Sequence, residues 1–236
     1  MTDLRALWDF DDPAGSEQRF RAAAAVADGE ERAVLLAQVA RTLGLQERYA
    51  EGHAVLDGLV VSGPRVAAHV ELERGRLLRS SGDADASCAH FDAAEQAASA
   101  AGDDALRVDA LHMRALVAPV DERLALTEHA LEVAGRSSDP AARDWDASLL
   151  NNIGMVHADA GDWPAALTSF EQALVARERI GREDETRVAR WMVAWALRHL
   201  GRTAEALAMQ RALRADLDAA GLADPYVDEE LALLVE

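Results

Sequence analysis

The sequence predicts an all-α protein built from stacked antiparallel helix hairpins. Half of the 236 residues are apolar, and most of these are alanine and leucine, which are strong helix formers. Runs of β-branched residues and Asn-Gly hairpin signals are scarce. Turn signals recur near Glu47, Gly82, Gly161 and Gly201, at spacings of 35, 79 and 40 residues. Since 79 residues make two steps, a further turn is expected near residues 118–121, giving five hairpins.

The N-terminal elements follow from proline positions and apolar spacing. Asp12-Pro13 is a helix start, because proline is tolerated in the first turn, and Phe20 and Ala23 match the second helix of a half repeat. The first full hairpin covers about residues 33–63, with stripes at Leu36, Val39, Ala40, Leu43, Gly52 and Leu56. The second hairpin has its stripes at Gly75, Leu78, Ser87, Phe91 and Ala94.

The remaining elements are predicted in the same way. The third hairpin consists of helices over 104–117 and 121–135 that meet at Pro119. Asp139-Pro140 starts the first helix of the fourth hairpin. The fifth fits less well, because Arg190 and Gln210 stand where apolar residues are usual. After Asp224-Pro225 a short helix carries, roughly on one side, Tyr226, Val227, Leu231 and Leu234.

The fourth hairpin carries a family pattern. Leu150, Ile153, Gly154 and His157 have a large–large–small–large spacing. A turn at Gly161-Asp162 follows, and Ala166 and Phe170 then form an A-x3-F spacing. The chain therefore resembles a tetratricopeptide-repeat protein, and hairpins four and five are similar to the longer repeats of kinesin light chains. The resemblance implies a right-handed α-solenoid over residues 13–236 as a single repeat domain, with 1–12 as an N-terminal extension.

Composition excludes several kinds of partner. The net charge is −18, which argues against nucleic acid, because phosphate binding needs a basic surface. Cys88 is the only cysteine, so an intramolecular disulfide or a cysteine metal cluster is impossible. Apolar runs are too short for a membrane span, and the first 25 residues do not resemble a signal peptide. We expect a cytoplasmic protein, and the absence of lysine suggests a bacterial one.

Motifs for catalysis and metal binding are also missing. The seven histidines form no H-E-x-x-H pair, and His157 occupies a packing position. There is no G-x-S-x-G nucleophile turn and no lysine for Schiff-base chemistry. We therefore predict no enzyme activity, no catalytic residues, no metal and no cofactor.

The resemblance implies a binding surface on the concave side, formed by the first helix of each repeat. In that family the surface lies one residue along from the packing stripe, and helix geometry at 100° per residue separates the two directions in hairpin five. The predicted peptide-binding residues are Arg41, Arg76, Arg79, Asn151, Met155, Trp191, Trp195 and Arg198. The surface is basic and aromatic although the protein is acidic. It predicts a protein or peptide partner with an apolar side chain and an acidic group or free C-terminus.

Alternatives stay open at this point. The arginines could instead pair with acids on neighbouring helices, such as Glu71 or Glu73. The two tryptophans could pack against the C-terminal helix through Tyr226 or Leu231. The predicted function is a non-catalytic scaffold or adaptor. The alternative is a peptide-sensing regulatory domain that acts with a separate effector. The sequence leaves the partner and the oligomeric state open.

Overall fold

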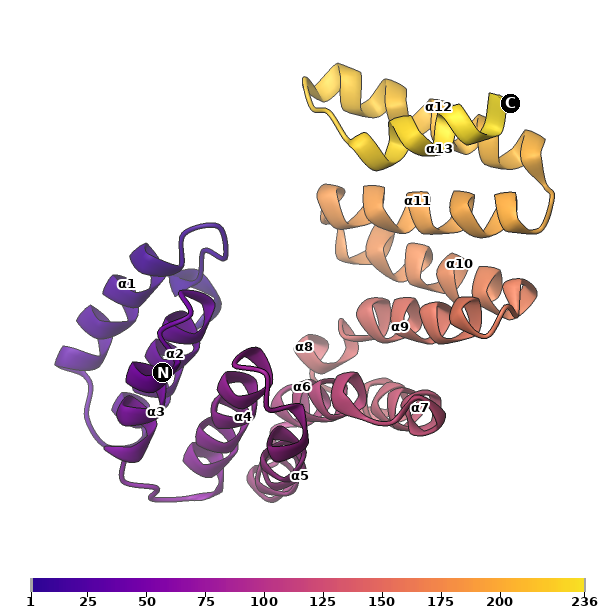
Figure 1. Ribbon diagram of the computed structural model, residues 1–236. Helices are drawn as coiled ribbons and strands as arrows, with labels where there is room; N and C mark the ends of the chain where they lie inside the picture. The colour runs from indigo at the N-terminus through magenta and orange to yellow at the C-terminus, as the bar shows by residue number, and fades with distance from the viewer. Residues whose placement is uncertain (1, 236) are drawn as a thin grey trace. The chain divides into compact units, whose positions relative to one another are not determined.

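The computed structural model describes residues 2–235, which are almost entirely helical and contain no β-strand (Figure 1). This confirms the predicted all-α solenoid of stacked antiparallel hairpins. The helices are η1 (Arg5–Leu7), α1 (Pro13–Val26), α2 (Gly29–Leu45), α3 (Tyr49–Asp57), α4 (Pro64–Ser80), α5 (Ala84–Ala101), α6 (Asp104–Val117), α7 (Val120–Arg136), α8 (Pro140–Arg143), α9 (Asp146–Asp159), α10 (Trp163–Ile180), α11 (Glu183–His199), α12 (Thr203–Ala220) and α13 (Pro225–Val235).

The helices form two compact units, of which the first ends at Ala142 and the second begins at Arg143. Unit 1 contains α1 and the hairpins α2–α3, α4–α5 and α6–α7. Unit 2 contains the hairpins α9–α10 and α11–α12, with α13 packed on α12. The five predicted hairpins are therefore present. A single repeat domain over residues 13–236 stays a prediction.

Glycine allows the two helices of a hairpin to approach closely. A Cβ atom on Gly75 would lie 2.5 Å from a ring carbon of Phe91, and one on Gly154 would lie still closer to Phe170. Both phenylalanines are fully buried. Only a residue without a side chain fits beside these rings, which explains why Gly154 occupies the small position of the family pattern.

The turns lie where the spacing predicted them. Gly82, Gly161 and Gly201 have positive φ angles of 99°, 76° and 73°, and Glu47 has φ of 60°. Glycine adopts this left-handed conformation without steric cost, so it ends one helix and redirects the chain. The third hairpin is also confirmed, because α6 and α7 meet at Pro119.

Two local predictions are wrong. The first helix of hairpin four begins at Asp146 rather than at Pro140, which instead opens the four-residue α8. Arg179 of α10 binds Asp144 and Asp146 at 2.8 Å, which stabilises the turn between α8 and α9. In α13, Tyr226 is 66% exposed, whereas Val227 is fully buried. The buried side of α13 is therefore rotated away from Tyr226.

The segment before α1 packs on the first two helices of unit 1. Leu7 and Trp8 lie against the buried cluster around Phe20 and Leu35. The Arg19 side chain donates to the Leu7 carbonyl at 2.9 Å. Residues 2–12 therefore belong to the folded part of unit 1, although they lie outside the repeat pattern.

Candidate functional site

A row of polar side chains crosses the first helices of the three hairpins in unit 1. Helical residues three or four apart share one face, so each helix presents its members on one side. We call this row the polar seam; it consists of Gln38, Arg41, His69, Glu73, Arg76 and Asp109. It includes two of the predicted binding residues, Arg41 and Arg76.

Arg76 joins α4 to α6. Its guanidinium donates to Glu73 and to Asp109, each at 2.5 Å. Burial disfavours the charged form of Arg76, but Asp109 and Glu73 outweigh this effect and raise its pKa. Burial raises the pKa of Glu73 despite the nearby guanidinium of Arg76. Arg76 thus pairs with acids, as the alternative interpretation of the arginines expected.

Gln38 joins α2 to α4. Its amide nitrogen lies 3.5 Å from Nδ1 of His69, and its amide oxygen accepts a hydrogen bond from the Trp8 indole at 3.1 Å. His69 is buried, and this burial lowers its pKa to about 4. The imidazole is therefore neutral at pH 7, which leaves the arginines as the cationic members of the seam.

Arg41 differs from the other arginines of the predicted site. Among residues 2–235, its guanidinium has no hydrogen-bond acceptor and no ion-pair partner, and its nitrogen atoms are not sealed from solvent. It lies over the rings of Trp8 and Phe10, with centroid distances of 5.1 and 5.3 Å. Burial lowers the pKa of Arg41, and the positive charge of Arg76 adds to this shift, whereas the carboxylates of Glu73 and Asp109 oppose it. Arg79, one helical turn past Arg76, is exposed.

In unit 2, two of the three predicted binding residues on α11 contact α13. Arg198 donates to both carboxylate oxygens of Glu230, at 2.7 and 2.9 Å, and these bonds raise its pKa. The Trp191 indole donates to the Tyr226 carbonyl at 3.2 Å, and its ring meets the Tyr226 ring edge-on. The packing of Trp191 on the C-terminal helix is the arrangement that the alternative interpretation expected.

Trp195 lies within an aromatic cluster in unit 2. Its ring stacks on Trp191 at 5.9 Å and meets Trp163 edge-on at 4.9 Å. His199 stacks on Trp163 at 3.7 Å. Met155, Trp191 and Trp195 all pack against the same buried cluster, which includes Phe170 and Leu197. Asn151, on the same helix as Met155, is half-buried. The structure thus brings Trp191, Trp195 and Met155 into one cluster of unit 2.

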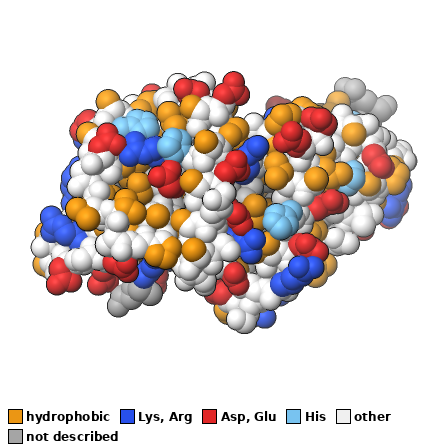
Figure 2. Space-filling view, turned by 90° about the horizontal axis from the view of Figure 1, so that it is seen from below, with side chains coloured by type: hydrophobic (Ala, Val, Ile, Leu, Met, Phe, Trp, Pro, Cys, Tyr) orange, Lys and Arg blue, Asp and Glu red, His pale blue; other side chains and the backbone are white. Residues whose placement is uncertain are grey.

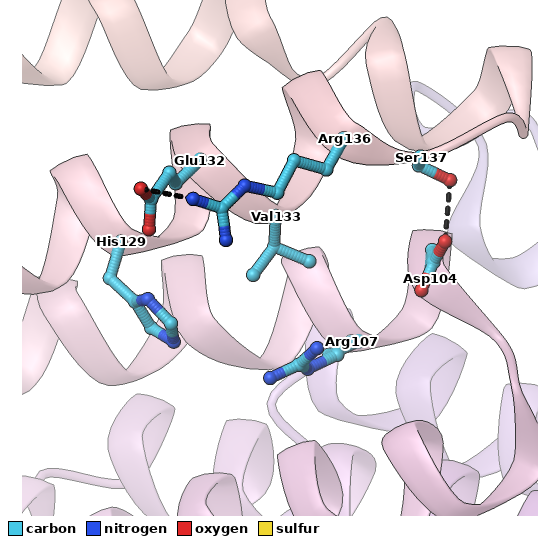
Figure 3. Close-up of a pocket in the computed structure, with 7 residues that line it drawn as sticks. All are labelled: Asp104, Arg107, His129, Glu132, Val133, Arg136 and Ser137. Atoms are coloured by element: carbon cyan, nitrogen blue, oxygen red, sulfur yellow. Dashed lines mark hydrogen bonds and ion pairs between the residues drawn. The ribbon is translucent and has the colours of Figure 1, made fainter.

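Unit 1 also contains a small polar cavity between α6 and α7, with a volume of about 190 Å³ (Figure 3). Its charged groups already have partners. Asp104 accepts from Ser137 at 2.6 Å, and Arg136 pairs with Glu132 at 2.7 Å. Arg107 pairs with Glu95 at 2.6 Å. The cavity is smaller than most ligand pockets, and it includes none of the predicted binding residues.

Within residues 2–235, no group of three or more histidine, cysteine or acidic side chains is arranged to hold a metal ion. No described helix combines the length and the apolar character that a bilayer span requires. Acidic, basic and hydrophobic side chains are interspersed on the face drawn in Figure 2. That face shows no continuous basic surface of the kind that binds nucleic acid.

Comparison with known proteins identifies the repeats. The tetratricopeptide-repeat family model matches residues 145–216, from the start of hairpin four to α12. Over these residues the chain is similar to tetratricopeptide repeats. The match includes Gly154 and Phe170, whose close contact the family pattern predicts. No curated protein matches the chain by sequence.

Solved structures extend the likeness to the rest of the fold. BtubC (BKLC) from P. vanneervenii is 14% identical with a TM-score of 0.68, and the match covers 95% of each chain. Nearly identical TPR-like repeats of a putative kinesin light chain from Podosopora anserina are 15% identical with a TM-score of 0.62, over 83% of this chain and 99% of that one. The apo quorum sensor NprR from B. thuringiensis is 13% identical with a TM-score of 0.65, over 96% of this chain and 64% of that one. At these identities the likeness shows the fold.

The sequence interpretation missed Trp8, Phe10 and Gln38 as neighbours of Arg41. Trp8 and Phe10 lie in the segment that the repeat pattern leaves out, and Gln38 lies among the apolar residues of α2. One signal was available: Trp8 and Phe10 are two residues apart, so an extended backbone presents both rings on one side.

Proposed function

We propose that the chain is a non-catalytic scaffold or adaptor that binds a protein or peptide on the first-helix surface of its hairpins. Tetratricopeptide repeats and the related fold of the neighbours support a protein-binding role. The proposed binding residues are Arg41, Arg76 and Arg79 in unit 1, and Asn151, Met155, Trp191, Trp195 and Arg198 in unit 2. Each unit presents its own part of this surface.

The observation that carries the proposal is the unpartnered guanidinium of Arg41. Arginine has five N–H donors in a planar fork, which matches a carboxylate in a bidentate geometry. Arg41 has no acceptor among the described residues and lies beside two aromatic rings. A ligand with an acidic side chain or a free C-terminus satisfies these donors. An adjacent apolar side chain of the ligand would pack against the Arg41 side chain, as Trp8 and Phe10 do.

A peptide-sensing regulatory domain that acts with a separate effector is the second candidate. The fold match to a quorum sensor, NprR, favours this candidate. The two candidates share the binding surface and differ in the consequence of binding. If the chain is a sensor, an affinity-purified effector should dissociate from it or bind more tightly when the peptide is added. An adaptor should instead bind the peptide-bearing protein itself.

Selection from a random 12-residue peptide phage library tests the proposed surface. Peptides enriched on the wild-type chain are synthesised, and their binding is measured by fluorescence anisotropy. We expect Arg41→Leu to weaken binding at least ten-fold. The matched control, Arg211→Leu, removes an exposed arginine of α12 and should leave binding unchanged. Equal affinity of the wild type and Arg41→Leu for every enriched peptide would reject the role of Arg41.

A further inference from the structure

Residues 2–12 lie along α2, beside the polar seam. The Thr2 backbone N–H and hydroxyl both donate to Glu31, at 2.6 and 2.8 Å. Trp8 donates to Gln38, and Phe10 lies under Arg41. Residues 2, 8 and 10 of the segment thus contact residues 31, 38 and 41 of α2 in that order, so the segment runs in the same direction as the helix. Ten helical residues span about 15 Å, so the segment follows α2 for roughly three turns.

The end of this segment presents two aromatic rings to Arg41. Trp8 has an extended backbone, with φ −85° and ψ 134°. Residues two apart in an extended chain point to the same side, and the rings of Trp8 and Phe10 are stacked at 4.8 Å and 2°. Phe10 is 58% exposed. A guanidinium over aromatic faces is a favourable contact, yet it leaves the N–H donors of Arg41 unused.

The segment contains one short 3-10 helix, and it is held by the packing of Leu4, Leu7 and Trp8 on unit 1 and by side-chain hydrogen bonds. The backbone of Asp9 exchanges two hydrogen bonds with Ser16, both at 2.9 Å, and Leu7 accepts from Arg19. Trp8 also meets the ring of Phe20 edge-on at 5.1 Å. Because no helix hairpin includes residues 2–12, their release would uncover Gln38 and Arg41 without breaking the contacts between hairpins.

We propose that residues 2–12 are an intramolecular competitor for the binding surface at Arg41. The partner is then a segment that reproduces their contacts and also carries the acidic group for the free donors of Arg41. It carries two aromatic side chains two residues apart in an extended backbone, one of them with an N–H or O–H group that donates to Gln38. This inference rests on the proposed function of the same surface, and it adds the chemistry of the partner and the step that binding requires.

The test uses the full chain and a fluorescein-labelled synthetic peptide with the sequence of residues 2–12 as the probe. A tethered segment has an effective concentration in the mM range, so it should compete strongly with the free peptide. We expect the Trp8→Ala/Phe10→Ala variant to bind the probe at least ten-fold more tightly than the wild type does. The matched control, Tyr226→Ala, removes an exposed aromatic ring in unit 2 and should behave as the wild type.

A second variant addresses the packing of Trp8 against Phe20. Phe10→Ala alone leaves that packing intact, and it should bind the probe about three-fold more tightly than the wild type. If the wild type and both variants bind the probe with equal affinity, or if none of them binds it, residues 2–12 do not compete for this surface. The proposed function is tested separately, because peptides selected on the wild type can still depend on Arg41. If the competition fails but the selected peptides still depend on Arg41, the surface binds peptides and residues 2–12 are a fixed part of unit 1.

Discussion

The arginines on the first-helix surfaces of the two units differ in their partners. In unit 2, α13 supplies Glu230, which binds Arg198 through two hydrogen bonds, and the Tyr226 carbonyl, which accepts from Trp191. In unit 1, Glu73 and Asp109 pair with Arg76, whereas the guanidinium of Arg41 lies over aromatic rings and has no hydrogen-bond acceptor or ion-pair partner among residues 2–235. We call a surface closed where a neighbouring helix supplies an acid within hydrogen-bond distance of the arginine, and open where the arginine keeps free donors; the same repeat geometry gives both.

The largest expected effect tests the packing that both units share. Gly154→Leu should lower the free energy of unfolding by about 3 kcal/mol, because the new side chain overlaps the buried ring of Phe170. Gly75→Leu in unit 1 should cost a similar amount. Gly135 is the matched control, because nothing lies within 4 Å of a Cβ added there. Urea unfolding measures all three. A Gly154→Leu protein as stable as the Gly135→Leu control would show that the crossing is assigned incorrectly.

Acidification should lower the stability of unit 1 because His69 is buried in its neutral form. The folded pKa of about 4 lies below the ordinary value of 6.5 because the ring is buried. The unfolded chain therefore binds the proton first, and stability is lost as the pH falls from 6.5 towards 4. The loss attributable to this group approaches about 3 kcal/mol. Glu73, whose pKa is raised, has the opposite dependence.

The measurement is urea unfolding of the wild type and His69→Gln at several pH values between about 7 and 4.5. The difference in unfolding free energy between the two proteins should change with pH, with the wild type losing more stability on acidification. His129→Gln is the control, because His129 is exposed. A constant difference between the wild type and His69→Gln would contradict the assignment.

Replacing Arg198 should cost more stability than replacing Arg41. Arg198→Leu leaves the buried carboxylate of Glu230 unpaired and should cost about 2 kcal/mol of stability. Arg41→Leu breaks no hydrogen bond or ion pair among the described residues, so it should cost less than about 1 kcal/mol. Thermal unfolding compares the two variants. Equal destabilisation would remove the distinction between the closed and open surfaces.

The smallest effect concerns hairpin five. Gln210 lies 16 residues after Ala194, just as Phe91 follows Gly75. It is fully buried, and neither of its amide atoms has a hydrogen-bond partner in the described structure. Gln210→Met should stabilise the protein by about 1 kcal/mol, because it removes buried unsatisfied groups. Gln96→Met, on the exposed side of α5, should have no effect. A lower melting temperature for Gln210→Met would show that the amide is satisfied in solution.

Local signals allowed most of the helices to be predicted. Prolines and turn glycines gave the limits of α6 and α13 and the turns at Gly82 and Gly161. The break before Asp146 was missed because Arg179, about 33 residues away, stabilises it. The contact of Trp8 with Gln38 likewise joins segments 30 residues apart. Which arginine keeps free donors depends on the acids of other helices, and helix periodicity within one repeat does not contain this information.

Photo-crosslinking of a selected peptide tests the central claim most directly. A peptide enriched on the wild-type chain is synthesised with a benzophenone side chain and irradiated with the protein, and mass spectrometry locates the attachment sites. An open surface in unit 1 predicts crosslinks to α2, α4 and α6 around Arg41, and their loss in Arg41→Leu. Crosslinks confined to α11 and α13 around Trp191, unchanged in Arg41→Leu, would contradict the account.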